Sequence, residues 1–387
     1  MKICLVNLDF IPYRSSGLAV YGETLALGLA EAGHKVVVVS AQRPGLTAHE
    51  WHNEIEIYRV PLGPMDWVSY AWRAGPLVAR LQRTYTFDMV HFLDGHFAYH
   101  YRGLFVASLF QSFRQRVTSD GGWPYHSNWR SLLVRLFYYN VARWPVEAPT
   151  VRRASGLIAA SQAAADEFTT HYGIAPERVT VVPLGIDLQR FYPRDTTALR
   201  HQLELETKTL LLYVGFCTPR KGLEYLARAL HQLPDTVRVL IIGRWESSYR
   251  AKVYRALGEA ANRVIELGYV PDADLPDYYA LADIFVFPSL LEGFGLPIAE
   301  ALACETPVVT THAGSSPEVV GPGGRIVPPR DSDALAGAIK ELERNAELRR
   351  QLGRAGRQWV LSHFDQRRMV EEHLAAYANW VGRIGFS

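Results

Sequence analysis

Two glutamates bracket a glycine-rich turn in the second half of the chain. Glu292 and Glu300 lie in the stretch EGFGLPIAEA, which follows the apolar run IFVFPS at 284–289. The run is typical of a buried strand. Pro297 suits the first turn of a helix, where its missing N–H is not needed. The pattern predicts a strand, a turn and a helix, with a carboxylate on each side of the turn.

The turn itself has the features of an anion site. Gly293 and Gly295 let the backbone approach a ligand closely. Backbone N–H groups then point away from the strand end, and these belong to Phe294, Gly295 and Leu296. A helix N-terminus attracts phosphate, whereas carboxylates accept hydrogen bonds from sugar hydroxyls. The combination predicts a nucleotide-sugar pocket. The plainer alternative is a solvated Glu292 and a Glu300 that only complements the helix dipole in the first helical turn.

Two cations stand at another expected strand-to-helix junction. The segment VGFCTPRKG at 214–222 places Arg220 and Lys221 where a helix begins. Cations at a helix start are unfavourable because they oppose the helix dipole. Beside a bound diphosphate the same cations would be favourable. The alternative is that both side chains bend into solvent.

The first half of the chain has its own candidate phosphate loop. Ser15, Ser16 and Gly17 join the first expected strand to the first expected helix. Their backbone N–H groups are able to face a phosphate. A serine before a helix is also an ordinary N-cap, and both interpretations stay open.

Two further loops of the first half carry polar side chains. HFLDGHFAYHY at 91–101 contains Asp94 and His96, and VTSDGGWPYHSNW at 117–129 contains Asp120 beside two glycines. Either loop is suited to orienting a sugar hydroxyl or an acceptor, although a lone histidine is more often a structural residue.

The segment WRSLLVRLFYYNVARW at 129–144 mixes aromatic residues with arginines at helical spacing. One interpretation is an amphipathic helix packed on its own domain. The other is attachment to an anionic membrane surface, because basic and aromatic residues favour the lipid interface.

Composition limits the broad class. The 387 residues suggest two domains, and 48% hydrophobic and 21% charged residues are ordinary for a globular protein. A net charge of +2 argues against a dedicated nucleic-acid binder. The N-terminal MKICLVNLDF is typical of a strand rather than a signal peptide. Three scattered cysteines suggest core thiols in a reducing cytoplasm, with peripheral location at the inner face of a membrane if 129–144 attaches there.

Strands and helices alternate in both halves, which predicts parallel sheets covered by helices on both faces. The expected strands are 2–8, 35–40, 89–93, 156–161, 179–185, 209–215, 237–243, 264–270, 284–289 and 306–311. A polar boundary falls near 187–195. Ligands of such folds bind at the carboxyl ends of the strands, and the cleft between two domains is the default site.

The chain resembles the retaining glycosyltransferase family 4, which has the GT-B fold. The residues that carry the resemblance are EGFGLPIAEA (292–301), PRKG (219–222), AGSSPEVV (313–320), VVPLGIDLQRFYP (181–193) and AEAGHKVVVVS (30–40). The resemblance implies an α/β protein with two Rossmann-like, doubly wound domains facing a central cleft. The acceptor domain would cover 1–188, completed by the C-terminal helix at 365–387, and the donor domain 189–364.

The resemblance also implies roles for individual residues. Glu292 resembles the acid that contacts the donor sugar, Glu300 the acid that holds the ribose, and Lys221 the lysine on the diphosphate. The remaining donor contacts would be the backbone of Phe294, Gly295 and Leu296, the main chain of Tyr269 and Val270 at the nucleobase, and Gly17, which matches the second glycine of the family's N-terminal loop.

This sequence departs from the family pattern at three positions. Ser16 replaces the first glycine of the N-terminal loop, and Phe216 stands where an arginine usually contacts the diphosphate. We expect Arg220 or Arg244 to supply that charge instead. The third departure concerns the first domain, where Asp120 occupies the place of a common catalytic histidine and His96 is the competing candidate.

The expected function is transfer of a hexosyl group from a UDP- or GDP-sugar to a hydroxyl acceptor in glycan, polysaccharide or glycolipid biosynthesis. The acceptor would be a sugar, a lipid-linked sugar or a small molecule. Neither a cofactor nor a metal is expected, because cationic side chains can stabilise the leaving diphosphate. The alternatives are a GT-B epimerase or phosphorylase and a non-catalytic nucleotide-sugar binding protein. A dinucleotide oxidoreductase is disfavoured because no G-x-G-x-x-G follows the first expected strand.

Overall fold

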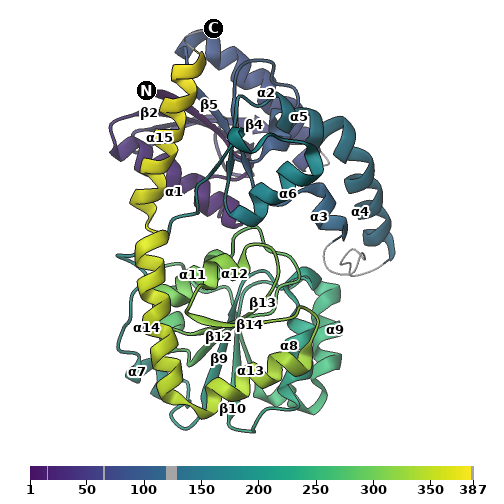
Figure 1. Ribbon diagram of the computed structural model, residues 1–387, viewed down its shortest axis with the longest axis vertical. Helices are drawn as coiled ribbons and strands as arrows, with labels where there is room; N and C mark the ends of the chain where they lie inside the picture. Colours follow the sequence, from purple (N-terminus) through teal and green to yellow (C-terminus); the bar gives the residue numbers. More distant parts are fainter. Residues whose placement is uncertain (15, 64–65, 119–128, 385–387) are drawn as a thin grey trace. The chain divides into compact units, whose positions relative to one another are not determined.

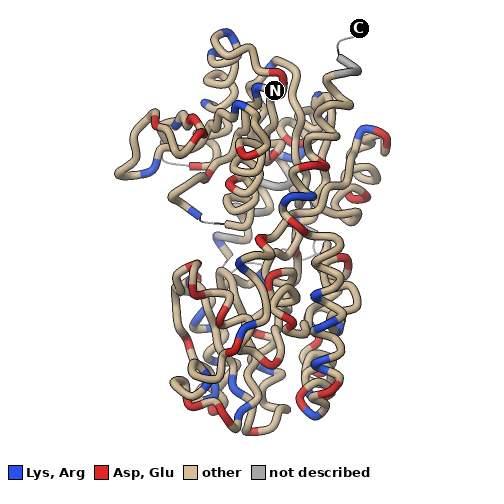
Figure 2. The backbone as a smooth tube through the Cα atoms, turned by 90° about the vertical axis from the view of Figure 1, so that its left-hand side faces the viewer, with Lys and Arg blue, Asp and Glu red and all other residues tan. Residues whose placement is uncertain are grey.

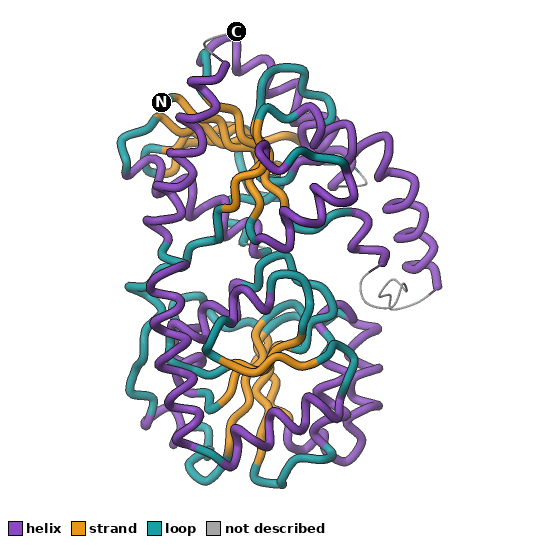
Figure 3. The backbone as a smooth tube through the Cα atoms, viewed as in Figure 1, coloured by secondary structure: helices purple, strands orange, loops and turns teal. Residues whose placement is uncertain are grey.

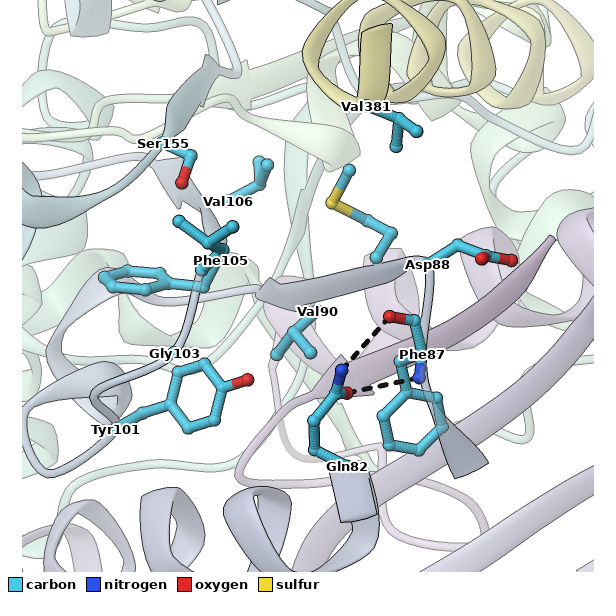
Figure 4. Close-up of a pocket in the computed structure, with 12 residues that line it drawn as sticks. Gln82, Phe87, Asp88, Val90, Tyr101, Gly103, Phe105, Val106, Ser155 and Val381 are labelled. Carbon is cyan, nitrogen blue, oxygen red and sulfur yellow. Dashed lines mark hydrogen bonds between the residues drawn. The ribbon is translucent and has the colours of Figure 1, made fainter. Parts of the chain in front are cut away.

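The computed structural model describes residues 1–14, 16–63, 66–118 and 129–384. The chain divides into two compact units (Figure 1). The first comprises 1–113, 138–185 and 366–387, and the second comprises 114–137 and 186–365. In each unit a central sheet has helices on both of its faces (Figure 3).

The sheet of the first unit has eight strands in the order β3-β4-β2-β1-β5-β6-β7-β8. Every neighbouring pair is parallel except β3 and β4. The strands are β1 (Lys2–Val6), β2 (Lys35–Gln42), β3 (His49–His52), β4 (Ile55–Pro61), β5 (Met89–Phe92), β6 (Val106–Leu109), β7 (Gly156–Ala159) and β8 (Val179–Val181). The helices are α1 (Gly17–Glu31), α2 (Asp66–Tyr85), α3 (Phe113–Thr118), α4 (Trp129–Ala142), α5 (Ala148–Arg153), α6 (Gln162–Tyr172) and α15 (Gln366–Ile384). All of α3 after Phe113 and the part of α4 up to residue 137 fall in the second unit. Shorter turns of helix are η1 (Gly95–Ala98), η2 (Arg143–Glu147) and η3 (Pro176–Arg178).

The sheet of the second unit has six parallel strands in the order β11-β10-β9-β12-β13-β14. The strands are β9 (Thr209–Val214), β10 (Val237–Ile242), β11 (Val264–Gly268), β12 (Ile284–Phe287), β13 (Val308–Thr311) and β14 (Gly324–Val327). The helices are α7 (Thr197–Gln202), α8 (Leu223–Leu230), α9 (Ser247–Leu257), α10 (Leu275–Leu281), α11 (Leu296–Ala303), α12 (Ser316–Val320), α13 (Ser332–Arg344) and α14 (Ala346–His363), with η4 (Pro219–Lys221) and η5 (Gly258–Arg263) between them.

The alternating parallel architecture predicted from the sequence is confirmed, and all ten expected strands are present within a few residues. The sequence patterns did not predict β3, β4, β6 and β14. The edge strand β3 reads HEWH, which lacks an apolar run. In β4, Glu56 and Arg59 interrupt the apolar pattern, yet both are buried and paired with side chains from other segments.

The last helix, α15, belongs to the first unit and packs on α1 (Figure 1). Its buried His373 Nε2 lies 2.7 Å from the Tyr21 hydroxyl on α1. Its Tyr377 hydroxyl lies 2.6 Å from Nδ1 of His91 on β5. Burial lowers the pKa of His373 to about 4, so this polar contact forms between neutral groups.

Acidic and basic residues are interspersed along both units (Figure 2), which agrees with the net charge of +2. Within the described residues, no helix combines the length and the apolar content needed to cross a bilayer.

Candidate functional site

Three loops of the second unit meet at the carboxyl ends of β9, β12 and β13, and two glycines bring them together. Gly222 has φ +69°, and a Cβ atom there would lie 2.0 Å from the carbonyl oxygen of Pro288. Gly314 has φ +55°, and its Cβ atom would lie 2.0 Å from the carbonyl oxygen of Glu292. Any other residue would therefore push the loops apart. The backbone N–H of Leu290 also donates to the Arg220 carbonyl at 2.7 Å.

These loops bring both predicted cations to one predicted carboxylate. Nζ of Lys221 lies 2.5 Å from Oε2 of Glu292, and Nη1 of Arg220 lies 3.8 Å from the same oxygen. Only 11% of the Lys221 and Glu292 side-chain surfaces is exposed. Arg220 also donates to the Leu291 carbonyl at 2.9 Å. The side chains therefore do not bend into solvent, and the three charged groups form one cluster.

The protonation of this cluster follows from burial and proximity. Burial and the charge of Arg220 lower the pKa of Lys221 to about 8, although Glu292 opposes the shift. Burial would raise the pKa of Glu292, but Lys221 and Arg220 outweigh it and hold that pKa below its ordinary value. Glu292 is thus ionised at neutral pH and balances one of the two cations.

Two helices begin beside the cluster at glycines, and in the first turn of α8 the Tyr249 hydroxyl accepts a hydrogen bond of 3.1 Å from the N–H of Glu224. The N-cap of α8 is Gly222 and that of α11 is Gly295, each with positive φ. The first N–H groups of a helix have no partner within the helix, and glycine offers no side chain to satisfy them. Two helix starts and two cations make this part of the unit suitable for a polyanion.

If Glu300 only complemented the helix dipole, it would lie in the first turn of α11. It lies beyond that turn. The first turn of α11 contains no acidic residue, so Glu300 is not placed to complement the helix dipole. Its Oε2 accepts a hydrogen bond of 2.7 Å from the buried Tyr279 hydroxyl on α10. Burial raises the pKa of Glu300. Tyr279 thus fixes the orientation of this carboxylate, and no sequence pattern singled it out.

An exposed cluster lies at the ends of β9, β10 and β11. The side chain of Phe216 is 55% exposed and that of Tyr269 is 67% exposed. The Arg244 guanidinium lies 6.0 Å from the centre of the Tyr269 ring. Val270, the other predicted nucleobase residue, is buried. The structure therefore places Arg220 beside Lys221 and Glu292, whereas Arg244 lies beside Tyr269.

In the first unit, His96 is buried between two carboxylates and is not an exposed base. Its side chain is 6% exposed, Nδ1 contacts Asp94, and Nε2 lies 3.0 Å from Oε1 of Glu147. Burial would lower the pKa of His96, but the two carboxylates raise it to about 9. Its ring stacks on Phe113 with centroids 4.0 Å apart. Glu147, which no sequence pattern singled out, thus makes His96 part of a buried ionic network.

The N-terminal loop is described in part. Helix α1 begins at Gly17, and the Ser16 hydroxyl accepts a hydrogen bond of 3.3 Å from the N–H of Ala19. Ser16 is therefore an N-cap. Ser15 and Asp120 lie outside the described residues, so the assignment of Asp120 stays a prediction.

Two family models match consecutive parts of the chain. Glycosyltransferase Family 4 matches residues 15–190, and Glycosyl transferases group 1 matches residues 195–359. The chain belongs to the group 1 glycosyltransferases. The residues of the charged cluster all lie in the part matched by the second model.

Individual proteins support this membership. This group 1 glycosyltransferase is 29% identical over 270 residues to the MMP alpha-(1->4)-mannosyltransferase of Mycolicibacterium hassiacum, a match that covers 66% of the chain and 61% of that relative. Sucrose-phosphate synthase from Thermosynechococcus elongatus has a TM-score of 0.82 at 23% identity, with 99% of both chains covered. Anabaena Alr3699/HepE in complex with UDP-glucose has a TM-score of 0.75 at 22% identity, with 98% of this chain and 100% of that chain covered. The two structures share the predicted GT-B fold.

Proposed function

We propose that this protein transfers a hexosyl group from a UDP- or GDP-sugar to a hydroxyl acceptor with retention of configuration. The observation that carries the proposal is the cluster of Lys221, Arg220 and Glu292 beside the starts of α8 and α11, whose N-caps are glycines. A diphosphate matches the positive groups of this cluster, and a sugar hydroxyl matches its carboxylate. Family membership supports the same assignment.

The arrangement suggests how donor binding rearranges the charges. In the free protein, Glu292 is the counter-ion of Lys221. A bound diphosphate would take over Lys221 and Arg220 through charge-assisted hydrogen bonds. Glu292 would then accept hydrogen bonds from hydroxyls of the hexose. As the bond to the leaving diphosphate breaks, charge develops next to groups that are already oriented, which is the electrostatic form of catalysis.

The nucleoside would extend from the diphosphate toward two other groups. The Glu300 carboxylate, held by Tyr279, is suited to accept hydrogen bonds from both ribose hydroxyls. The backbone at Tyr269 and Val270 would contact the nucleobase, as the family resemblance implies. The exposed Phe216 would give the donor an apolar neighbour in place of the usual arginine. Because two cations and two helix starts supply positive charge, we propose that transfer does not need a metal ion.

For the acceptor, we propose a chemical class and no individual compound. The mannosyltransferase relative supports a role in glycan or glycolipid biosynthesis, and a sugar, a lipid-linked sugar or a small molecule with a free hydroxyl fits that role. The chain spans 61% of that relative's length.

The test combines donor binding with product analysis. Calorimetric titration with UDP, GDP and their hexose conjugates, with and without Mg²⁺, should show one tightly bound series whose affinity is independent of the ion. Lys221→Ala should abolish most of this affinity. The matched control is Lys208→Ala, because Lys208 lies directly before the amino end of β9, whereas the cluster lies at the carboxyl ends of the strands. Incubation of the bound conjugate with an acceptor panel should then give product of unchanged anomeric configuration by NMR.

Several results would contradict the proposal. Turnover of the donor without any acceptor hydroxyl would indicate an epimerase, and dependence on inorganic phosphate would indicate a phosphorylase. Donor binding with neither transfer nor slow hydrolysis would indicate a binding protein. Inverted product would overturn retention and leave the transferase assignment intact.

A further inference from the structure

Helix α4 exposes a row of large apolar side chains. Trp129, Leu133, Phe137 and Val141 repeat every four residues, and their exposed fractions are 64%, 55%, 69% and 52%. Trp144, just beyond the helix, is 56% exposed. At about 100° of rotation per residue, all five fall within a sector of about 120°. We call these five residues the apolar stripe.

Two leucines on another side of α4 are less exposed than the apolar stripe. Leu132 and Leu136 are only partly exposed, and at about 100° per residue both point away from the middle of the apolar stripe. The described side chains of the apolar stripe therefore face solvent. A contiguous exposed apolar face of this length marks an interaction surface rather than scattered surface residues.

The charged residues of the segment that carries the apolar stripe all have one sign. From 129 to 146 the sequence contains three arginines and no acidic residue. The exposed Arg130 places its guanidinium 5.4 Å from the centre of the Trp129 ring. Arg143 lies 4.6 Å from the Trp144 ring and donates to the His171 carbonyl at 3.1 Å. Helix α3 adds Arg114 and Arg116, and its sequence FRQRVT contains no acidic residue. The partner that fits must therefore be apolar and anionic together.

We propose that the apolar stripe docks on an anionic lipid bilayer, with α4 lying in the plane of the interface. A helix with aromatic and aliphatic residues beside arginines inserts its apolar face into the boundary between headgroups and acyl chains. Trp129 and Trp144 stand near the two ends of the row, and tryptophan favours the headgroup level. Arg130 would meet the negative surface potential. This docking goes beyond glycosyl transfer and does not depend on the donor site.

Charge also argues against a second copy of the chain as the occupant. A two-fold symmetric contact pairs the same patch on both copies. Each copy would then bring its arginines against those of the other, with no acidic residue on either patch to compensate. An anionic bilayer supplies the missing negative charge.

The test is cosedimentation of the full chain with phosphatidylcholine vesicles, with and without phosphatidylglycerol. We expect binding to the anionic vesicles only. The double variant Leu133→Ser/Phe137→Ser should reduce the partition coefficient by at least about tenfold, because it removes two apolar side chains from the interface. Arg130→Gln should reduce it by about fivefold, and added salt should weaken binding. The matched control is Trp51→Ser, which removes a 57% exposed tryptophan from β3.

Folding and self-association are checked in parallel. All of these side chains are exposed, so the melting temperatures of the variants should match that of the unaltered chain. Equal vesicle binding by the double variant and the Trp51→Ser control would overturn the proposal. Equal binding to vesicles with and without phosphatidylglycerol would also overturn the proposal. A concentration-dependent dimer in the ultracentrifuge that the double variant abolishes would assign the apolar stripe to a second copy.

Discussion

The ammonium of Lys221 lies 2.5 Å from the Glu292 carboxylate, although 71 residues separate them in the sequence. The two side chains come from loops that follow β9 and β12, which are neighbouring strands of one sheet. Arg220 lies 3.8 Å from the same carboxylate oxygen. One carboxylate therefore balances only one of the two cations, and the cluster retains one net positive charge. A diphosphate would change that balance, so the pair links donor binding to the position of Glu292.

The two members of the pair should have separable effects on binding. Lys221→Ala is expected to weaken both the free nucleoside diphosphate and its sugar conjugate, by about 10- to 150-fold, since a hydrogen bond to a charged group contributes about 1.5–3 kcal/mol. Glu292→Gln is expected to spare the free nucleoside diphosphate and to weaken the sugar conjugate and its turnover. Calorimetry with the two ligands on both variants measures this directly. A Glu292→Gln protein that loses both ligands equally would show that the carboxylate does not contact the sugar.

The lowered pKa of Lys221 predicts a pH dependence of donor binding. Because its pKa is about 8 in the free protein, the cation is lost as the pH rises through that value. Affinity for the nucleoside diphosphate should therefore be constant below pH 7 and fall above pH 8. Lys221→Arg should remove the bend near pH 8, because arginine stays protonated throughout. Titrations between pH 6 and 10 with both proteins test this, and an identical bend in the arginine variant would assign it to another group.

Short-range sequence patterns predicted the strand, the turn and the helix around Glu292, because the signals for these elements lie close together in the chain. The apolar run of β12, the glycines after it and Pro297 in α11 act within a few residues of one another. The contact of Lys221 with Glu292 could not be predicted in this way, because it depends on the packing of two separate loops. The role of Tyr279 in holding Glu300 depends in the same way on the neighbouring helix α10.

The first unit shows more clearly that local patterns do not reveal contacts between distant segments. Its strand β4 was missed because buried charges break the apolar pattern, and those charges are satisfied by partners elsewhere in the chain. Arg59 is paired with Glu50, and Glu56 accepts a hydrogen bond from the Tyr85 hydroxyl. His96 was a candidate for substrate contact on the basis of its loop. Its second carboxylate partner, Glu147, is 51 residues away.

The close loop contact at Gly314 should be sensitive to a single methyl group. In Gly314→Ala the new Cβ atom would lie 2.0 Å from the Glu292 carbonyl oxygen, at a φ of +55° that alanine disfavours. The loop that carries Glu292 must then move, so we expect a fall in donor affinity of tenfold or more, together with about 1–3 kcal/mol of lost stability. Gly337→Ala is the control, because its Cβ atom meets nothing within 4 Å and it lies inside α13. Calorimetry and urea unfolding on the two variants should give opposite signs for stability, and equal donor affinities would contradict the loop argument.

His96 should contribute to stability in a pH-dependent way, because its pKa rises from the ordinary 6.5 to about 9 on folding. A raised pKa means that the folded state binds the proton more tightly. The contribution is therefore fully present below pH 6.5 and is lost as the pH rises through 9. A shift of this size corresponds to a free energy on the order of 3 kcal/mol.

The variant His96→Gln removes this titration while keeping a polar side chain between Asp94 and Glu147. The difference in unfolding free energy between the unaltered chain and the variant should be largest at pH 6 and should shrink by pH 10. Urea unfolding at pH 6, 8 and 10 measures it. A constant difference across this range, together with a large fall in turnover, would assign His96 to substrate contact. A shrinking difference with donor affinity intact would assign it to the buried network with Asp94 and Glu147.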